Sequence, residues 1–534
     1  MAYLARKPIK RAVGRSVTLP SPVGGWNARD ALSAMDELDA VTMENWFPDT
    51  TDVYLRKGRE VWATGLGDQV ETLMTYGGVS AQQCWALAGT SIFDVSTAGA
   101  KTAYATAPVP TLTNARWQYV NTASSGGVYV MLAVNGTDKL IGYDGTVWNQ
   151  DGDASAKYDI TGVSTANCIN INVHKGRVWL IQKNTLDAWY LATGAIKGAA
   201  TKFSLNGVAR SGGSLIAMGT WTIDAGYGVD DNAVFITDRG EMIVYSGTDP
   251  ASPATWQMIG IWQLGSPISY RCFVKWAGDL LLLTHDGLVP LAASLQSSRL
   301  DPRVNLTDKI QRAISEAIGN YEGNFGWEIQ PFPRANMLLI NIPVQTGASQ
   351  NQYVMNTINK SWCKFTGWDA NTFELFNDYL YMGGDEVVYK CWSGLSDQYY
   401  SSGNLDADIV GNVQQAFTYL KGPTQLKRFT LMHPVFATTF QQAQNGVSQS
   451  LFQDQGEAGQ GVQVLGVVED QSNLEARYQP NHPAANKDGY VYYPNVNVVE
   501  EMADMISASR SFQTNAELMN TAKTMMQKVL TLGQ

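Results

Sequence analysis

The sequence predicts a mainly β fold, and three features of its 534 residues support this prediction. Short apolar runs alternate with Gly, Asp and Asn over most of the chain, the pattern of strands joined by tight turns. The 50 glycines fit many such turns, and hydrophobic residues, at 45% of the chain, are enough for a large core. Aromatic residues recur among the apolar runs at irregular spacing. These features favour a β-propeller with diverged blades over the rival fold, a pair of β-sandwiches.

The strand-and-turn unit repeats from about residue 59 to residue 400. Clear copies lie at 143–148, 234–245, 281–289 and 379–389, each with a Gly or Asp turn between apolar runs. At ~40–50 residues per blade, this stretch predicts about seven or eight blades.

A basic arm precedes the strands. Residues 1–20 contain five cations and no acid; the cations are Arg6, Lys7, Lys10, Arg11 and Arg15. Such a run forms either a solvated flexible arm or an arm that contacts an acidic surface, protein or DNA phosphate.

Residues 21–58 form the predicted anchoring segment. Gly24 and Gly25 allow a turn with positive φ, and Trp26 follows directly. Residues 36–41 predict a short helix with Asp36 as N-cap and acids in its first turn. Pro48 should end it, because the residue before a proline disfavours helix, and Trp46 and Phe47 then flank the helix as aromatic anchors.

One helix is predicted inside the propeller, at about 307–319. Its apolar residues recur at helical spacing and are Ile310, Ala313, Ile314, Ala317 and Ile318. Gly319 should end it. Its predicted role is to cap the propeller or to contact another subunit. Residues 401–432 then return as a small platform segment.

The last region, residues 433–534, differs in composition from the rest. No Trp follows Trp392, and a Gln-rich linker runs from 441 to 463. A long C-terminal helix is predicted at about 497–531, because Asn497 and Glu500 form a capping-box pattern and apolar residues follow at 3/4 spacing.

Composition and motifs limit the function classes. The net charge of −10 argues against generic nucleic-acid affinity. The five cysteines lack metal or redox spacing, so we expect reduced core residues. No apolar run reaches the roughly 18 residues of a membrane span, and no secretory signal is recognised.

The sequence contains none of the usual catalytic or phosphate-binding signatures, such as HExxH, GxSxG or a P-loop. Asp230 and Asp231 could in principle supply two carboxylates, as in glycosidases. We expect no catalytic site, cofactor or metal, and keep a tail-associated propeller glycosidase as an alternative.

The stretch GGWNARDALSAMDELDAVTMENWFPDTTDVYLRKG, residues 24–58, resembles the opening of tail nozzle proteins of short-tailed bacteriophages. Residues 245–262, 278–291 and 422–429 are also similar to that family, so the resemblance spans roughly residues 20–430. It implies a structural propeller subunit of a ring that extends the DNA exit channel below the portal and its adaptor. It also implies that the assembly anchors are Trp26, Arg29, Asp30, Trp46 and Phe47.

The same resemblance implies partners and a location. A homohexamer would contact the portal-adaptor ring through the basic arm, carry tail fibre or tail needle proteins, and let genomic DNA pass without specific binding. The location would be the virion tail, after assembly in the host cytoplasm.

Residues 433–534 resemble instead the C-terminal half of a bacterial flagellar proximal-rod protein, which implies a flagellar rod component as the alternative function. The junction has three possible origins: natural recombination, an engineered fusion, or two sequences joined wrongly.

Overall fold

The computed structural model describes residues 18–78, 82–224, 229–276, 278–294, 304–345, 349–400, 405–418, 475–478 and 490–493. The chain divides into two compact units, Met1–Leu451 and Phe452–Gln534. The basic arm cations from Arg6 to Arg15 lie outside the described residues.

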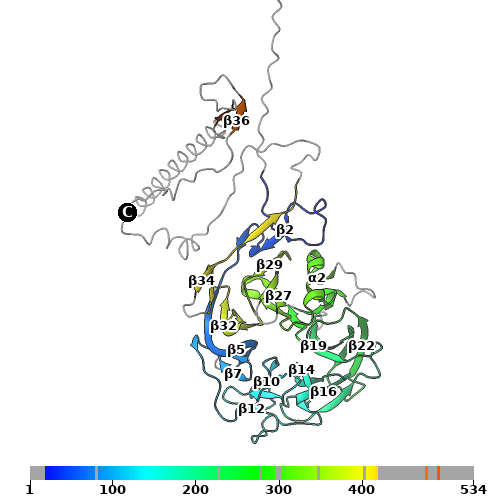
Figure 1. Ribbon diagram of the computed structural model, residues 1–534. Helices are drawn as coiled ribbons and strands as arrows, with labels where there is room; N and C mark the ends of the chain where they lie inside the picture. The colour runs from blue at the N-terminus through cyan, green and yellow to red at the C-terminus, as the bar shows by residue number, and fades with distance from the viewer. Residues whose placement is uncertain are drawn as a thin grey trace, which may run out of the picture. The chain divides into compact units, whose positions relative to one another are not determined.

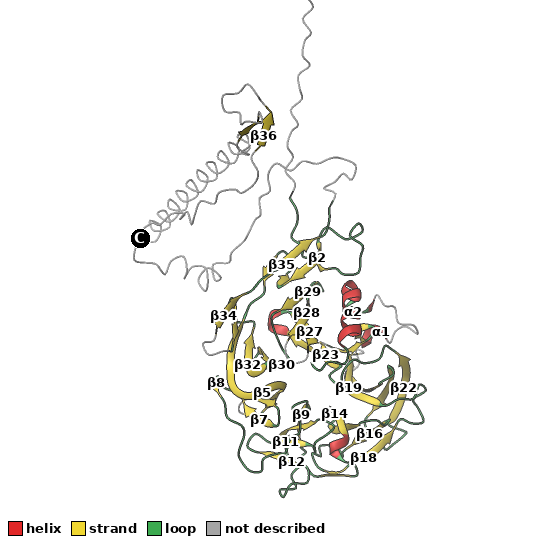
Figure 2. Ribbon diagram, viewed as in Figure 1, coloured by secondary structure: helices red, strands yellow, loops and turns green. Residues whose placement is uncertain are grey.

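The first unit is a ring of seven blade-like sheets (Figures 1 and 2). The innermost strands follow one another around the ring in the order β5, β9, β14, β19, β23, β26 and β30. Each of them contacts the blade of the next, and β30 contacts β5 to close the circle. The predicted mainly β propeller is therefore confirmed.

Four blades are each built from four antiparallel strands. The last of the four follows a three-stranded blade and belongs to a seven-stranded sheet that continues into the anchoring segment. The first comprises β9 (Gln118–Ala123), β10 (Tyr129–Val134), β11 (Ile141–Tyr143) and β12 (Trp148–Gln150). The second comprises β14 (Cys168–His174), β15 (Arg177–Gln182), β16 (Asp187–Tyr190) and β18 (Thr201–Ser204). The third comprises β19 (Leu215–Asp224), β20 (Val229–Thr237), β21 (Glu241–Gly247) and β22 (Trp256–Gln263). The fourth comprises β26 (Glu328–Phe332), β27 (Met337–Gln345), β28 (Ser349–Asn356) and β29 (Trp362–Thr366).

Of the other three blades, one has three strands, β23 to β25. The remaining two share the long strand β5 (Arg59–Gly77), which pairs with β32 in one and with β6 in the other. The N-terminal half of β5 pairs with β32, and its C-terminal half, from Val70, pairs with β6. Gly65 and Gly67, at φ of 81° and 70°, lie between the halves, where the strand leaves one blade for the next. The strands are β6 (Gln82–Ala88), β7 (Ser91–Asp94), β23 (Phe273–Trp276), β24 (Asp279–Thr284), β25 (Gly287–Pro290), β30 (Thr372–Phe376), β31 (Tyr379–Gly383) and β32 (Asp385–Cys391).

The core lies between blades. Trp179 of β15 stacks on Trp256 of β22 in the next blade, with ring centroids 5.7 Å apart. Trp85 of β6 similarly meets Trp148 of β12 edge to face at 5.4 Å. Alternating strand residues thus bury one face against each neighbouring blade, which is why the apolar runs are short and aromatic.

The anchoring segment is β structure, and the helix predicted at 36–41 is wrong. β1 (Gly25–Trp26) pairs in parallel with β2 (Asp39–Glu44), while β35 (Asn412–Gln415) pairs with the other side of β2. The Asn27 amide donates to the Ala40 carbonyl and the Ala416 amide donates to that of Asp39, so cross-strand bonds replace helical ones. Asp36 caps a turn, where its carboxylate accepts from the Leu38 amide. β3 (Trp46–Pro48) and β4 (Val53–Leu55) form a hairpin.

The inserted helix is α2 (Gln311–Tyr321), preceded by the 3₁₀ turn η3 (Asp308–Ile310). It continues past Gly319, where the sequence predicted its end, and packs on β25 and β27. All five apolar residues named for it are buried.

The remaining elements are short. They are β8 (Gly99–Ala100), β13 (Ile160–Thr161), η1 (Thr165–Asn167), β17 (Gly198–Ala199), α1 (Leu291–Ser294), η4 (Pro333–Ala335), β33 (Ser396–Tyr399) and β34 (Leu405–Asp408). In the second unit, β36 (Glu475–Tyr478) and β37 (Tyr490–Tyr493) form an antiparallel pair. The predicted helix at 497–531 and residues 419–432 of the platform lie outside the described residues.

Candidate functional site

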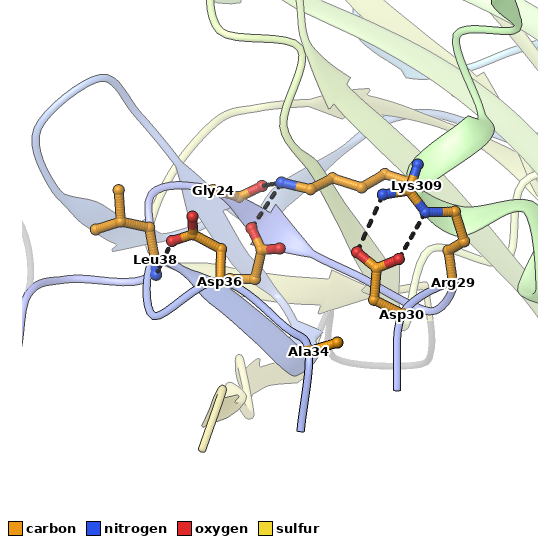
Figure 3. Close-up of a pocket in the computed structure, with 8 residues that line it drawn as sticks. Gly24, Arg29, Asp30, Ala34, Asp36, Leu38 and Lys309 are labelled. Carbon is orange, nitrogen blue, oxygen red and sulfur yellow. Dashed lines mark hydrogen bonds and ion pairs between the residues drawn. The ribbon is translucent and has the colours of Figure 1, made fainter. Parts of the chain in front are cut away.

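The candidate site is a shallow depression of about 400 Å³ between the start of the anchoring segment and η3 (Figure 3). The Gly24–Gly25 turn forms one wall. Gly25 has a φ of 77°, and a Cβ on Gly24 would lie 2.2 Å from the Asp39 carboxylate, so both positions require glycine. The turn brings β1 against β2 and places Asn27 at the edge of the depression.

Asn27 organises the loop that follows β1. Its side-chain oxygen accepts from the amides of Arg29 and Asp30, at 3.1 and 3.0 Å. Its amide nitrogen donates to the carboxylates of Asp30 and Asp39, at 2.9 and 2.7 Å. Because Asn27 is buried, these four bonds satisfy a side chain that would otherwise be costly.

Two cations and three carboxylates then connect this loop to η3. The Arg29 guanidinium grips Asp30 with two bonds of 2.8 and 3.0 Å and also contacts Asp308. Lys309 donates to Asp39 at 2.6 Å and to the Gly24 carbonyl at 2.9 Å. The hydrogen bonds from Arg29 lower the pKa of Asp30 to about 2. Asp30 is therefore suited to holding an ion pair and not to proton transfer near neutral pH.

Trp26 lies beside this site and is half-buried. Its ring meets Tyr353 of β28 edge to face at 5.1 Å, and it packs against the two apolar clusters on either side of the β26–β29 blade.

The other two predicted anchors lie in β3, apart from the pocket lining. Phe47 is 1% exposed and contacts Tyr54, Phe365 and Trp392, whereas Trp46 is half-buried. The structure thus brings Arg29 and Asp30 together at the depression, whereas Phe47 lies in β3 and does not line it.

Sequence reasoning missed the partners of these anchors. Asp308 and Lys309 are about 280 positions away in the chain, and no local pattern marks them. It also missed Arg56, which is 2% exposed and donates to both carboxylate oxygens of Asp397, at 2.9 and 2.5 Å. Arg56 also donates to Asn45 and to the carbonyls of Lys57 and Thr366. The available signal for Arg56 was its position, as a charged residue in a strand segment rich in aromatic residues.

A second polar network lies where the inner strands of the propeller converge. Arg271 donates to Glu328 at the start of β26, to Thr372 at the start of β30, and to Thr72 of β5. It also donates to the carbonyls of Glu71 and Trp117. The guanidinium groups of Arg271 and Arg116 lie 5.3 and 4.4 Å from the centre of the Phe325 ring. One side chain therefore joins residues of five blades.

Glu374 of β30 belongs to the same interior, and among the described residues no cation hydrogen-bonds to it. Its carboxyl accepts from the Tyr119 hydroxyl at 2.8 Å and from the Leu375 amide at 3.1 Å. Burial raises the pKa of Glu374 to about 8, despite the opposing effect of the Tyr119 hydrogen bond.

Within the described residues, no group of three or more His, Cys, Asp or Glu side chains is placed to hold a metal ion. The five cysteines are buried and unpaired. Asp231, one of the two candidate carboxylates, accepts from Thr222 and faces Lys175. Among the helices that the structure describes, none is long and apolar enough to cross a membrane.

Comparison with known proteins finds a family match near the C-terminus. Residues 487–532 match the family described as flagellar basal body rod FlgEFG protein C-terminal. The flagellar basal-body rod protein FlgC of Salmonella typhimurium is 52% identical over 79 residues, covering 15% of this chain and 59% of that protein. FlgC of Bacillus subtilis is 43% identical over 79 residues, covering 15% and 53%. The chain thus spans little more than half the length of these relatives.

Solved structures similar to the chain include propellers. The Cps50 (Swd1) β-propeller domain of Myceliophteria thermophila aligns with 63% of this chain and 99% of its own, at 10% identity and a TM-score of 0.36. The extracellular domain of the putative one component system BT4673 from B. thetaiotaomicron aligns with 70% and 49%, at 10% identity and a TM-score of 0.39. These scores are too low to bear on function.

Proposed function

We propose that the chain is a structural subunit of a phage tail, a nozzle that forms a ring below the portal adaptor. The observation that carries the proposal is the attachment of the anchoring segment. The stretch that resembles the nozzle family is joined to the propeller at both ends, by Arg29 and Lys309 at η3 and by Arg56 at Asp397. Such double attachment suits a segment that transmits load between a ring contact and a propeller wall.

The proposal has a consequence for the path of DNA. Arg271, Phe325 and Arg116 occupy the region where five blades converge, so a duplex would not thread a single propeller. DNA would pass instead through the hole enclosed by a ring of subunits. The net charge of −10 favours a wall to which phosphates do not adhere, because each Lys or Arg contact would add affinity and slow sliding.

The proposed partners are other copies of the chain, six in the ring, with the adaptor above and fibre or needle proteins below. A closed ring arises from a heterologous interface whose rotation closes. Mass measurement of the assembled tail tests this: a copy number that is a multiple of six is expected, and any other number contradicts the proposed ring.

A flagellar rod component is the second candidate, and the FlgC similarity near the C-terminus favours it. Negative-stain images of the purified full chain with its adaptor separate the two. Short rings with a central hole support the nozzle, and rods or filaments support the flagellar function.

The junction can be tested directly. Peptide mass mapping of the native protein should show whether residues 433–534 are physically joined to the propeller. If they are foreign to the nozzle function, deleting them should leave ring formation unchanged.

A further inference from the structure

A cationic and aromatic cluster lies at the edge between the β26–β29 blade and the β30–β32 blade. The Arg334 guanidinium lies 4.3 Å from the centre of the Tyr379 ring, and the Lys390 ammonium lies 3.8 Å from the same centre. Lys390 is also 5.9 Å from the centre of the Trp62 ring. Two cations thus share one tyrosine, which is 37% exposed.

Among the described residues, neither Arg334 nor Lys390 has an Asp or Glu oxygen within 4.0 Å. Arg29, Arg56, Arg271 and Lys309, by contrast, all have one. The chain has ten more acids than bases, so most surface cations should find an acidic neighbour. Two adjacent cations without one therefore need a specific explanation. The two cations also lower the pKa of the Tyr379 hydroxyl, with Arg334 as the main cause.

A hollow of about 550 Å³ adjoins the cluster. It is lined by Phe332, Pro333, Arg334, Leu375 and Asp378, so its wall is apolar with a cation and an acid. Pro333 and Arg334 belong to η4. Asp378 lies in the β30–β31 turn, Tyr379 begins β31, and Lys390 lies in β32. The site is therefore made by a turn of one blade and by a turn and two strands of the next.

Both turns are held in defined conformations. Asn336, Asn377 and Asp378 have φ of 52°, 49° and 62°, which single Asn and Asp residues tolerate in tight turns. The Asn336 carbonyl accepts from the Thr357 amide at 2.8 Å, and the Asn377 amide donates to Gln82 at 3.1 Å. Arg334 therefore projects from an ordered turn, and Lys390 projects from strand β32.

We propose that this cluster, defined by Arg334, Tyr379 and Lys390 with the adjoining hollow, binds a carboxylate-bearing peptide segment of a partner protein. The carboxylate pairs with Arg334 and Lys390 and accepts from the Tyr379 hydroxyl. A neighbouring apolar side chain enters the hollow against Pro333 and Leu375. Peptide N–H groups face Asp378. The site shares no residue with the anchoring segment and does not depend on the nozzle function.

Three features favour a peptide over other anions. Asp378 would repel a polyphosphate backbone, whereas it can accept from peptide amides. The Tyr379 ring already contacts two cations, so it is a poor stacking platform for a nucleobase or a sugar. The apolar wall needs an apolar group beside the anion.

The test uses the full chain and a fluorescent peptide that alternates Leu and Glu, with binding followed by anisotropy. The removed interactions are exposed ion pairs, so Arg334→Gln and Lys390→Met should each weaken binding by about threefold, and together by about tenfold. Met keeps the apolar stem of Lys390 on the tyrosine, so the fold should be retained, and melting curves check this. Lys197→Met is the matched control, because Lys197 is exposed and, within the described part of the chain, its ammonium donates to the Ala156 carbonyl and not to a carboxylate.

Three results would overturn the proposal. The first is peptide binding that is absent or that the double substitution leaves unchanged. The second is equal binding of a Leu and Gln peptide, which would remove the role of the carboxylate. The third is preferential binding of oligothymidylate that the same substitutions abolish, which would make this a nucleic-acid site.

Discussion

Two arginines attach the anchoring segment, one at each end, and they differ mainly in burial. Arg56 and Asp397 have side chains that are 1% and 5% exposed. Arg29 is 44% exposed, and its partners Asp30 and Asp308 are 30% and 27% exposed. Each arginine binds both oxygens of one carboxylate, but water reaches the Arg29 contacts far more than those of Arg56.

The comparison separates attachment from stability. An exposed ion pair typically contributes ~0.2–1 kcal/mol, because water competes for both charges. Removing one partner of a buried pair costs about 3–5 kcal/mol, because the other charge stays buried and unpaired. The buried Arg56–Asp397 attachment should therefore stabilise the fold. The exposed Arg29 attachment contributes little to stability and is free to serve assembly.

The largest effect should come from Arg56→Ala. We expect the free energy of unfolding to fall by about 3–5 kcal/mol, since Asp397 loses both guanidinium bonds. Urea unfolding of the full chain followed by tryptophan fluorescence measures the change. The double variant Arg56→Met with Asp397→Leu is the control and should lose much less. Equal losses would mean that packing matters here and the charge does not.

For the aromatic anchors too, the loss of stability on truncation should be larger for the more buried residue. Phe47→Ala should cost about 3–5 kcal/mol, because the ring is 1% exposed and surrounded by aromatic rings. Trp26→Ala should cost less, since Trp26 is half-buried. Thermal melting of the two variants compares them, and a larger loss for Trp26 would reverse the proposed contrast between the two ends.

Glu374 is a buried acid that forms no ion pair with any residue the structure describes. Its raised pKa means that, between about 4.3 and 8, the folded state holds a proton that the unfolded state has lost. Stability should therefore fall as pH rises through this range and level off above 8. Melting temperatures of Glu374→Gln should lack this slope. A slope identical to that of the original chain would assign it to other groups.

The smallest effect on stability should come from Arg29→Ala. We expect a loss of about 0.2–1 kcal/mol that shrinks further in high salt. The lowered pKa of Asp30 confines any acid dependence of this pair to pH below about 4, where stability is lost as pH falls toward 2. Ring assembly should suffer more than melting does. Normal ring assembly of the variant would mean that the Arg29 attachment is not part of the proposed nozzle interface.

Sequence patterns predicted local structure well where one face of an element is apolar. The helical spacing from Ile310 to Ile318 corresponds to α2, whose apolar face is buried. The pattern at residues 36–41 failed because Asp36 is also a good turn former and Ala40 has partners on both sides. A local capping pattern carries no information about pairing with strands that lie far away in the sequence.

The sequence by itself determined a mainly β fold, because short apolar runs between Gly and Asp turns form strands, and their irregular aromatic spacing favoured blades over a pair of sandwiches. It also singled out Arg29 and Asp30, which lie next to each other in the chain and in the structure. The tertiary structure alone decided the partners Asp308, Lys309 and Asp397, and the pairing of Arg334 with Lys390 across Tyr379. These residues meet only after a ring closes, and no local pattern encodes which turns of neighbouring blades become adjacent.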